Sequence, residues 1–293
     1  MSSSIFPVHN TSKTWIIYTC LLVVLSALCF GSLRDHLIDT HDDQTFRDNI
    51  ALSQDFAYFF APLEEKQLGS GRPAAELVKW LGYVVWGNDL GWFHLLVVAI
   101  HTVAALVLAR TALQLGLNLE LSLIGGVLFL VNVTHVRAVQ WISGLDYPLS
   151  LVCGLGAVLC FARHLFTGKP AWLLGSYGCL MLGVMSHFSI VAVLPFCLYW
   201  SWYRGIGFNA ALRKLLPISA LVGVVLLFLL GITAKTSSTW HSIGLYAEGD
   251  FLGLVAGISR VLLWFLSRLL STAHWYLVPV YVLQTWELYV GCA

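Results

Sequence analysis

Residues 41–49 (HDDQTFRDN) form the densest group of polar side chains in the chain. Asp42 and Asp43 are adjacent, and two neighbouring carboxylates raise each other's proton affinity. One of them can therefore act as a general base near neutral pH, and the pair can bind a divalent cation through oxygen ligands. The competing interpretation is a solvated turn that caps a helix, because Asp is common at such positions.

The composition places this polar group in a membrane protein. The chain has 293 residues, 58% of them hydrophobic and 11% charged, with a mean hydropathy of +0.80. Soluble domains are roughly 45–50% apolar and about 25% charged. The net charge is +1 and no basic run occurs, so we expect no nucleic-acid partner. Six of the seven cysteines lie in apolar segments without metal-ligand spacing, which indicates small buried side chains.

Long apolar segments predict an all-α fold, a polytopic bundle of about 8–9 transmembrane helices. Residues 14–32 are long enough to cross about 30 Å of hydrocarbon. A cleaved signal peptide is the alternative, but the run is long for one and no small-x-small site precedes the charged segment. We expect the later helices at about residues 91–110, 119–137, 147–166, 170–186, 188–203, 215–234, 251–270 and 274–290.

Residues 33–90 are predicted to be a long loop outside the cytoplasm, and the whole chain 1–293 a single membrane domain without repeats. The loop holds ten of the fifteen acidic residues. Within it, residues 74–86 form an amphipathic segment after Gly71-Arg72-Pro73, which predicts a helix along the membrane interface. If the N-terminus is cytoplasmic, Glu120 is the single acid at the cytoplasmic helix ends. The bases at those ends are Lys13, Arg110, Arg163, Lys169, Arg204, Arg213, Lys214 and Arg268.

Several separated motifs resemble those of one membrane enzyme family. They are residues 71–73 (GRP), 86–94 (WGNDLGWFH), 132–144 (NVTHVRAVQWISG) and 185–188 (MSHF). Together with Asp42-Asp43, they are similar to the membrane part of polyprenyl-phosphate-sugar glycosyltransferases of the GT-C class. The likeness is to the protein O-mannosyltransferases that carry tetratricopeptide repeats after their membrane domain; this chain contains no such repeats.

The resemblance implies transfer of a sugar, with mannose as one candidate, from a polyprenyl-phosphate carrier to a protein or glycan acceptor outside the cytoplasm. Asp42 or Asp43 would be the catalytic base, and the same carboxylates are the candidate ligands of a divalent cation. The chain departs from the family pattern where Arg137 replaces a Glu, Leu145 an Arg, and His187-Phe188 a Lys-Glu pair.

The lipid-linked sugar donor needs a cation near the depth of the lipid headgroups, because its phosphate is negatively charged. Arg72 and Arg260 are the candidates, and snorkelling to the interface is the alternative role for each. Three histidines are candidates for contact with sugar or phosphate: His94, His135 and His187. Hydrogen bonds that hold helices together explain a buried histidine equally well.

Asp146 precedes Pro148 at the start of an apolar segment, where we expect it to cap a helix.

The apolar segments and the family resemblance together predict an integral, multi-pass membrane glycosyltransferase surrounded by lipid. The alternative from another class is a non-catalytic scaffold or assembly subunit of the same fold, which the replaced polar residues favour. A transporter is less well supported, because the two halves have no matching pair of broken helices.

Overall fold

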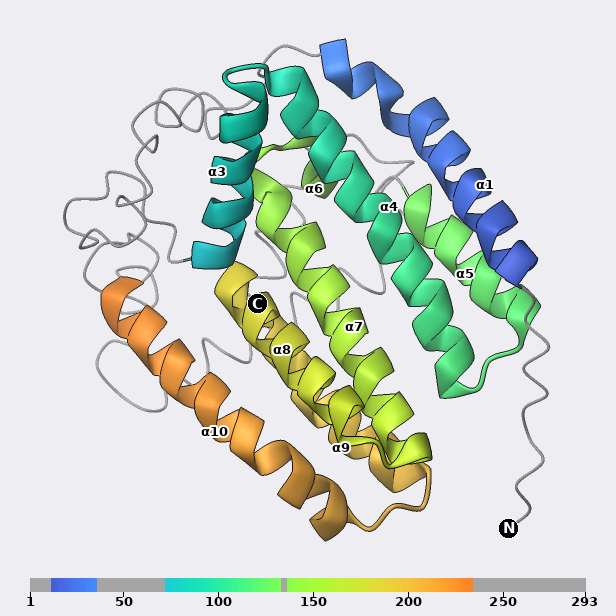
Figure 1. Ribbon diagram of the computed structural model, residues 1–293, viewed down its shortest axis with the longest axis vertical. Helices are drawn as coiled ribbons and strands as arrows, with labels where there is room; N and C mark the ends of the chain where they lie inside the picture. The colour runs from blue at the N-terminus through green and yellow to red at the C-terminus, as the bar shows by residue number, and fades with distance from the viewer. Residues whose placement is uncertain (1–11, 36–71, 133–135, 234–293) are drawn as a thin grey trace, which may run out of the picture. The chain divides into compact units, whose positions relative to one another are not determined.

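The computed structural model describes residues 12–35, 72–132 and 136–233 (Figure 1). All regular structure in these ranges is α-helix or 3-10 helix, so the prediction of an all-helical membrane bundle is confirmed. Residues up to Ile232 belong to one compact unit. A second unit begins at Thr233, and everything after that residue lies outside the described ranges.

The helices follow one another through short connections, apart from the long segment between residues 35 and 72. In chain order they are α1 (Ser12–Phe30), η1 (Gly31–Asp35), α3 (Pro73–Trp86), α4 (Leu90–Leu115), α5 (Leu119–Leu130), α6 (Val136–Gln140), η5 (Ser143–Leu145), α7 (Asp146–Thr167), α8 (Pro170–Ser186), η6 (Phe188–Ala192), α9 (Val193–Tyr203) and α10 (Phe208–Thr233).

Local sequence signals set many helix ends. Pro73 and Pro170 begin α3 and α8, where a missing N–H has no cost and the fixed φ suits a helix. The Asp89 carboxylate accepts a hydrogen bond from the backbone N–H of Gly91, at 3.0 Å, and caps α4. Gly116 ends α4 in the left-handed region, with a φ of 109°. The predicted helix after Gly71-Arg72-Pro73 is therefore present.

Four described helices have the length and composition to cross a membrane. They are Ser12–Arg34, Leu90–Leu115, Ser143–Thr167 and Phe208–Val225. Three more apolar helices are shorter: Leu119–Leu130, Pro170–Ser186 and Phe188–Tyr203. The predicted helices at residues 251–270 and 274–290 lie outside the described residues.

Several helix boundaries differ from the prediction, and α4 continues to Leu115, past the predicted residue 110. The helix predicted for residues 119–137 ends at Leu130, so α5 has 12 residues and a length of about 18 Å. His101 of α4 makes this early end possible, because its ring Nε2 lies 3.3 Å from the Leu130 carbonyl oxygen and satisfies that group. α10 starts at Phe208 and not near residue 215, and Lys214 in its second turn lies with its ammonium 3.0 Å from His164 Nε2 of α7.

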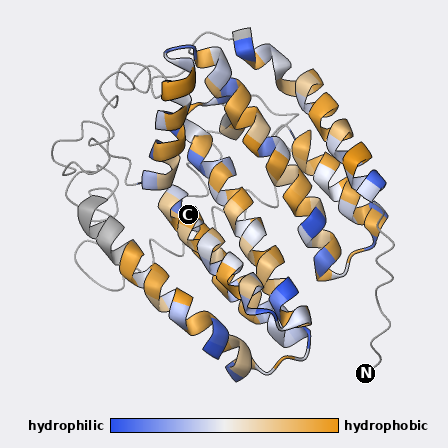
Figure 2. Cartoon of the chain, in the orientation of Figure 1, coloured by the Kyte–Doolittle hydropathy of each residue, from blue (hydrophilic) through white to orange (hydrophobic). Residues whose placement is uncertain are grey.

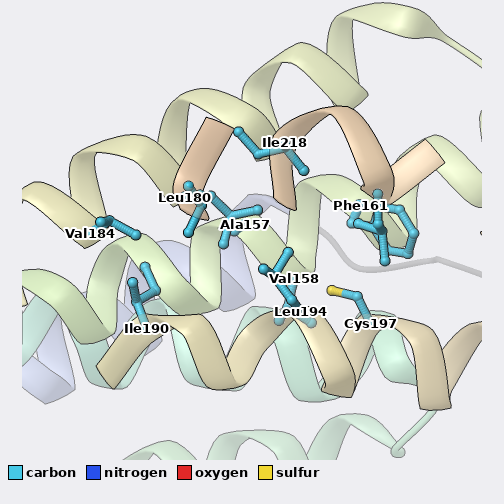
Figure 3. Packing of buried hydrophobic residues seen from close by; sticks show 11 residues of the cluster. Ala157, Val158, Phe161, Leu180, Val184, Ile190, Leu194, Cys197 and Ile218 are labelled. Atoms are coloured by element: carbon cyan, nitrogen blue, oxygen red, sulfur yellow. The ribbon is translucent and has the colours of Figure 1, made fainter. Parts of the chain in front are cut away.

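Buried apolar side chains join the helices into two main clusters. The larger one contains Phe161 of α7, Leu180 of α8, Leu194 of α9 and Ile218 of α10 (Figure 3). The other joins α1, α4 and α5. Hydrogen bonds between helices add to this packing, and the Ser176 hydroxyl donates to the Ala157 carbonyl oxygen at 2.9 Å.

Basic side chains gather at one end of this unit. Arg110, in the last turns of α4, lies 3.5 Å from the centroid of the Trp15 ring, near the start of α1. Near Arg110, where α7 ends and α8 begins, the Cζ atom of Arg163 lies 4.7 Å from the centroid of the Trp172 ring. Figure 2 shows mainly hydrophobic residues along α1, α4 and α10, with hydrophilic residues near helix ends. The side of the membrane on which this basic end lies stays a prediction.

The contact between α1, α4 and α5 leads to a stability prediction at Gly126. A Cβ atom there would collide with the Tyr18 hydroxyl and lie 2.8 Å from the Ala105 carbonyl oxygen, which belongs to the backbone. Gly126→Ala should therefore lower the unfolding free energy by about 1–3 kcal/mol through overpacking. Thermal unfolding of the purified protein in detergent measures this effect.

The neighbouring glycine supplies a matched control. A Cβ at Gly125 meets nothing within 4 Å, so Gly125→Ala should keep or raise the melting temperature, since Ala favours helix. Equal melting temperatures for the two variants would contradict the close contact at Gly126.

Candidate functional site

Arg72 and Asp146 form an ion pair between the start of α3 and the start of α7. The Arg72 Nη1 atom contacts Asp146 Oδ2. The Asp146 side chain is 1% exposed, whereas that of Arg72 is 30% exposed. The prediction that Asp146 caps its helix was wrong, because the N-cap residue is Leu145 and no side chain caps α7. A buried carboxylate needs a counter-charge more than a helix needs a cap, and Arg72 supplies it.

The ion pair leaves half of the carboxylate unused. Asp146 Oδ1 is buried and has no hydrogen-bond partner, while the single contact to Arg72 is made through Oδ2. An ionised carboxylate can accept several hydrogen bonds through both oxygens. An unsatisfied buried acceptor costs about 1–3 kcal/mol, so an added donor at Oδ1 would be favourable.

His187, between α8 and η6, lies in a row of rings beside the ion pair. Its ring centroid is 4.6 Å from that of Tyr147 and 4.6 Å from that of Phe188. The Arg72 Cζ atom lies 5.8 Å from the Tyr147 ring centroid, which continues the row. Tyr147 is 50% exposed and Phe188 60% exposed, whereas His187 and Asp146 are buried. We refer to Arg72, Asp146, Tyr147, His187 and Phe188 as the Arg72 cluster.

The hydrogen bond to the His187 ring indicates its tautomer, and its surroundings favour the neutral form. The backbone N–H of Ser189 donates to His187 Nδ1 at 3.2 Å, so Nδ1 carries no proton. Burial lowers the pKa of His187 below its ordinary value of 6.5, and the positive charge of Arg72 lowers it further, against the opposite effect of Asp146. The surroundings therefore favour the neutral ring, whose proton is on Nε2 when Nδ1 accepts from Ser189.

Two further hydrogen bonds fix the elements that carry the cluster. The Lys79 ammonium of α3 donates to the Ser143 carbonyl oxygen at 2.9 Å, just before α7. The Ser150 hydroxyl of α7 donates to the His187 carbonyl oxygen at 3.2 Å. α3, α7 and the end of α8 are thus tied together at the Arg72 cluster.

The structure brings together two of the predicted site residues, Arg72 and His187. His94 lies in the first turn of α4 and is 3% exposed, so it is enclosed by protein. The other predicted residues, Asp42, Asp43, His135 and Arg260, lie outside the described residues. Within the described ranges no group of three His, Cys, Asp or Glu side chains could hold a metal ion. The proposed metal ligands Asp42 and Asp43 are not in those ranges.

Sequence reasoning missed Asp146 and Tyr147 as members of the site. A usable signal was present, because an acid at the start of an apolar helix is costly without a partner. Arg72 precedes the neighbouring amphipathic helix and was already a candidate cation. Matching the isolated acid with that base would have predicted the ion pair.

The fold and the Arg72 cluster define a helical membrane protein with a charged, aromatic site where helices begin and end. The chain is similar to the protein O-mannosyl-transferase Tmtc2 of Drosophila melanogaster, with 27% identity over 164 residues. The match covers 54% of this chain and 18% of the relative. No protein-family model matches the chain, and no solved structure matches it. The similarity indicates a distant relationship to that transferase.

A double-mutant cycle tests the ion pair. Arg72→Gln leaves the Asp146 carboxylate buried without its counter-charge, and should lower the unfolding free energy by about 1–3 kcal/mol. Adding Asp146→Asn should recover part of this loss, with a coupling energy within roughly 0.5–3 kcal/mol. The exposed Arg213 of α10 gives the matched control Arg213→Gln, with no expected effect. Additive single effects would show that the two side chains do not interact.

The lowered pKa of His187 predicts a pH-dependent stability. Below pH 6.5 the unfolded chain binds a proton at this residue that the folded chain resists, so unfolding becomes easier as pH falls. His187→Phe keeps an aromatic ring and removes the titrating group. The melting temperature of the variant should therefore fall less than that of the wild type between pH 7 and pH 5. Parallel pH profiles for the two proteins would contradict the assignment.

Proposed function

We propose that this protein is a membrane glycosyltransferase that moves a sugar, with mannose as the first candidate, from a polyprenyl-phosphate carrier to a protein or glycan acceptor. The observation that carries the proposal is the Arg72 cluster, which offers a partly exposed guanidinium beside buried polar groups and exposed rings. A guanidinium matches the oxygens of a phosphate in geometry and charge. The distant similarity to an O-mannosyl-transferase supports the same reaction class.

The proposed reaction uses the loop that leads into Arg72. Asp42 or Asp43 accepts the proton of the acceptor hydroxyl as its oxygen bonds to the anomeric carbon of the sugar. The bond from that carbon to the phosphate oxygen breaks, and the polyprenyl phosphate leaves with the electron pair. Arg72 stabilises the additional negative charge on the leaving phosphate. The base later releases its proton to solvent.

The proposal includes a divalent cation at the reaction centre and an orientation of the bundle in the membrane. A divalent cation bound by Asp42 and Asp43 would neutralise charge on the leaving phosphate and would lower the pKa of a bound hydroxyl. The basic end of the bundle would face the cytoplasm, as the positive-inside rule expects. Loop 33–90 would then lie outside the cytoplasm together with the acceptor.

One observation favours the second candidate function, a non-catalytic scaffold of the same fold. Asp146 already neutralises part of the charge of Arg72, and Leu145 and Phe188 stand where the resembled family has Arg and Glu. Such a protein would keep the bundle and bind partners without transferring sugar.

Substitution of the two loop carboxylates separates the candidates. Asp42→Asn or Asp43→Asn should lower the rate of sugar transfer about 10²–10⁴-fold, because a general base contributes that much. Transfer from a radiolabelled polyprenyl-phosphate sugar into membrane proteins and glycans measures the rate. Asp48→Asn, in the same loop, is the matched control and should keep activity. Unchanged transfer by both variants at normal expression would refute the enzymatic function and leave the scaffold.

A further inference from the structure

We propose that Asp146 and His187 recognise hydroxyl groups of the sugar, so that the Arg72 cluster selects a glycosylated polyprenyl phosphate over the bare polyprenyl phosphate. This assignment rests on the proposed function and gives Asp146 a role in substrate specificity. It follows from the hydrogen-bonding capacity that the cluster leaves unused within the described residues.

The first unused group is an acceptor. Asp146 Oδ1 is buried without a hydrogen-bond partner, and Oδ2 alone contacts Arg72. A phosphate at neutral pH offers oxygens that accept hydrogen bonds, so it cannot satisfy a carboxylate. A hydroxyl group donates, and its hydrogen bond to an ionised carboxylate is among the strong ones.

The second unused group is a donor. Because Ser189 donates to Nδ1 of the neutral His187 ring, the proton lies on Nε2. None of the described residues accepts a hydrogen bond from Nε2. A hydroxyl oxygen can accept this hydrogen bond while the same hydroxyl group, or its neighbour on a sugar ring, donates elsewhere. A polyol therefore matches an acceptor on Asp146 and a donor on His187, two side chains that interact electrostatically.

The remaining members of the cluster indicate that the polyol ligand also carries a negative charge. Arg72, 30% exposed, supplies the positive charge for a phosphate. Tyr147 and Phe188 are 50% and 60% exposed, and their rings flank His187. Aromatic rings of this kind cover apolar faces of a ligand while polar groups fix its orientation. Side chains at a binding surface commonly change rotamer when a ligand binds, so a ligand that reaches the buried Oδ1 displaces side chains of the cluster.

Binding of two lipids tests the proposal without any transfer reaction. The probes are dolichyl phosphate mannose and dolichyl phosphate, each titrated against the full chain in nanodiscs. The wild type should bind the glycosylated lipid about ten-fold or more tightly than the bare one, as expected from one or two hydrogen bonds to charged or buried groups. Dolichyl phosphate glucose, in a third arm, measures preference among sugars.

Three variants separate specificity from structure. Asp146→Asn and His187→Phe should each bring the ratio of the two affinities close to one. His187→Phe also carries the test if Asp146→Asn does not fold, because it keeps the row of rings. Arg72→Gln should weaken the binding of both lipids by a similar factor and keep the ratio of their affinities. Arg213→Gln, at an exposed arginine of α10, should change neither affinity.

The outcomes distinguish this proposal from the proposed function. Equal affinity of the wild type for the two dolichyl lipids, or an unchanged ratio in folded Asp146→Asn or His187→Phe, would overturn the hydroxyl assignment even if Asp42 and Asp43 prove catalytic. A preference for the glycosylated lipid that both variants lose would support the assignment, even in a protein that transfers no sugar.

Discussion

The contact between the Arg72 guanidinium and the Asp146 carboxylate is the interaction on which the site depends. A carboxylate that is 1% exposed is tolerated only with a counter-charge, so this contact fixes the start of α3 against the start of α7. Arg72 directly follows the segment that contains Asp42 and Asp43 in the sequence. The same contact leaves Asp146 Oδ1 unsatisfied, which makes the pair a site as well as a structural link.

Much of the fold could be predicted from apolar length and from proline and glycine signals. Pro73 and Pro170 mark helix starts that the structure has, because their effect on the backbone is local. The Leu130 carbonyl oxygen at the end of α5 and the Lys214 ammonium in α10 have their partners, His101 and His164, on other helices. Contacts between helices cannot be predicted when each segment of the sequence is considered by itself.

The residues of the site also divide into those that the sequence could predict and those that it could not. Arg72 and His187 could be chosen by residue type and motif, whereas the role of Asp146 required knowledge of which helix ends meet. An Asp at a helix start commonly caps the helix. The buried Asp146 does not cap α7 and instead forms an ion pair with Arg72. The contribution of Asp42 and Asp43 remains a prediction. The distant similarity to Tmtc2 indicates a relationship to a transferase, and hydroxyl recognition by Asp146 and His187 stays a proposal.

Photoaffinity labelling tests directly whether the Arg72 cluster receives a lipid-linked phosphate. A polyprenyl phosphate with a diazirine next to its phosphate would be irradiated with the protein in nanodiscs and mapped by mass spectrometry. We predict labels on Tyr147, Phe188 and their neighbours, reduced by Arg72→Gln. Labels confined to the basic end of the bundle, near Arg163 and Arg204, would show that the phosphate binds elsewhere than at the Arg72 cluster.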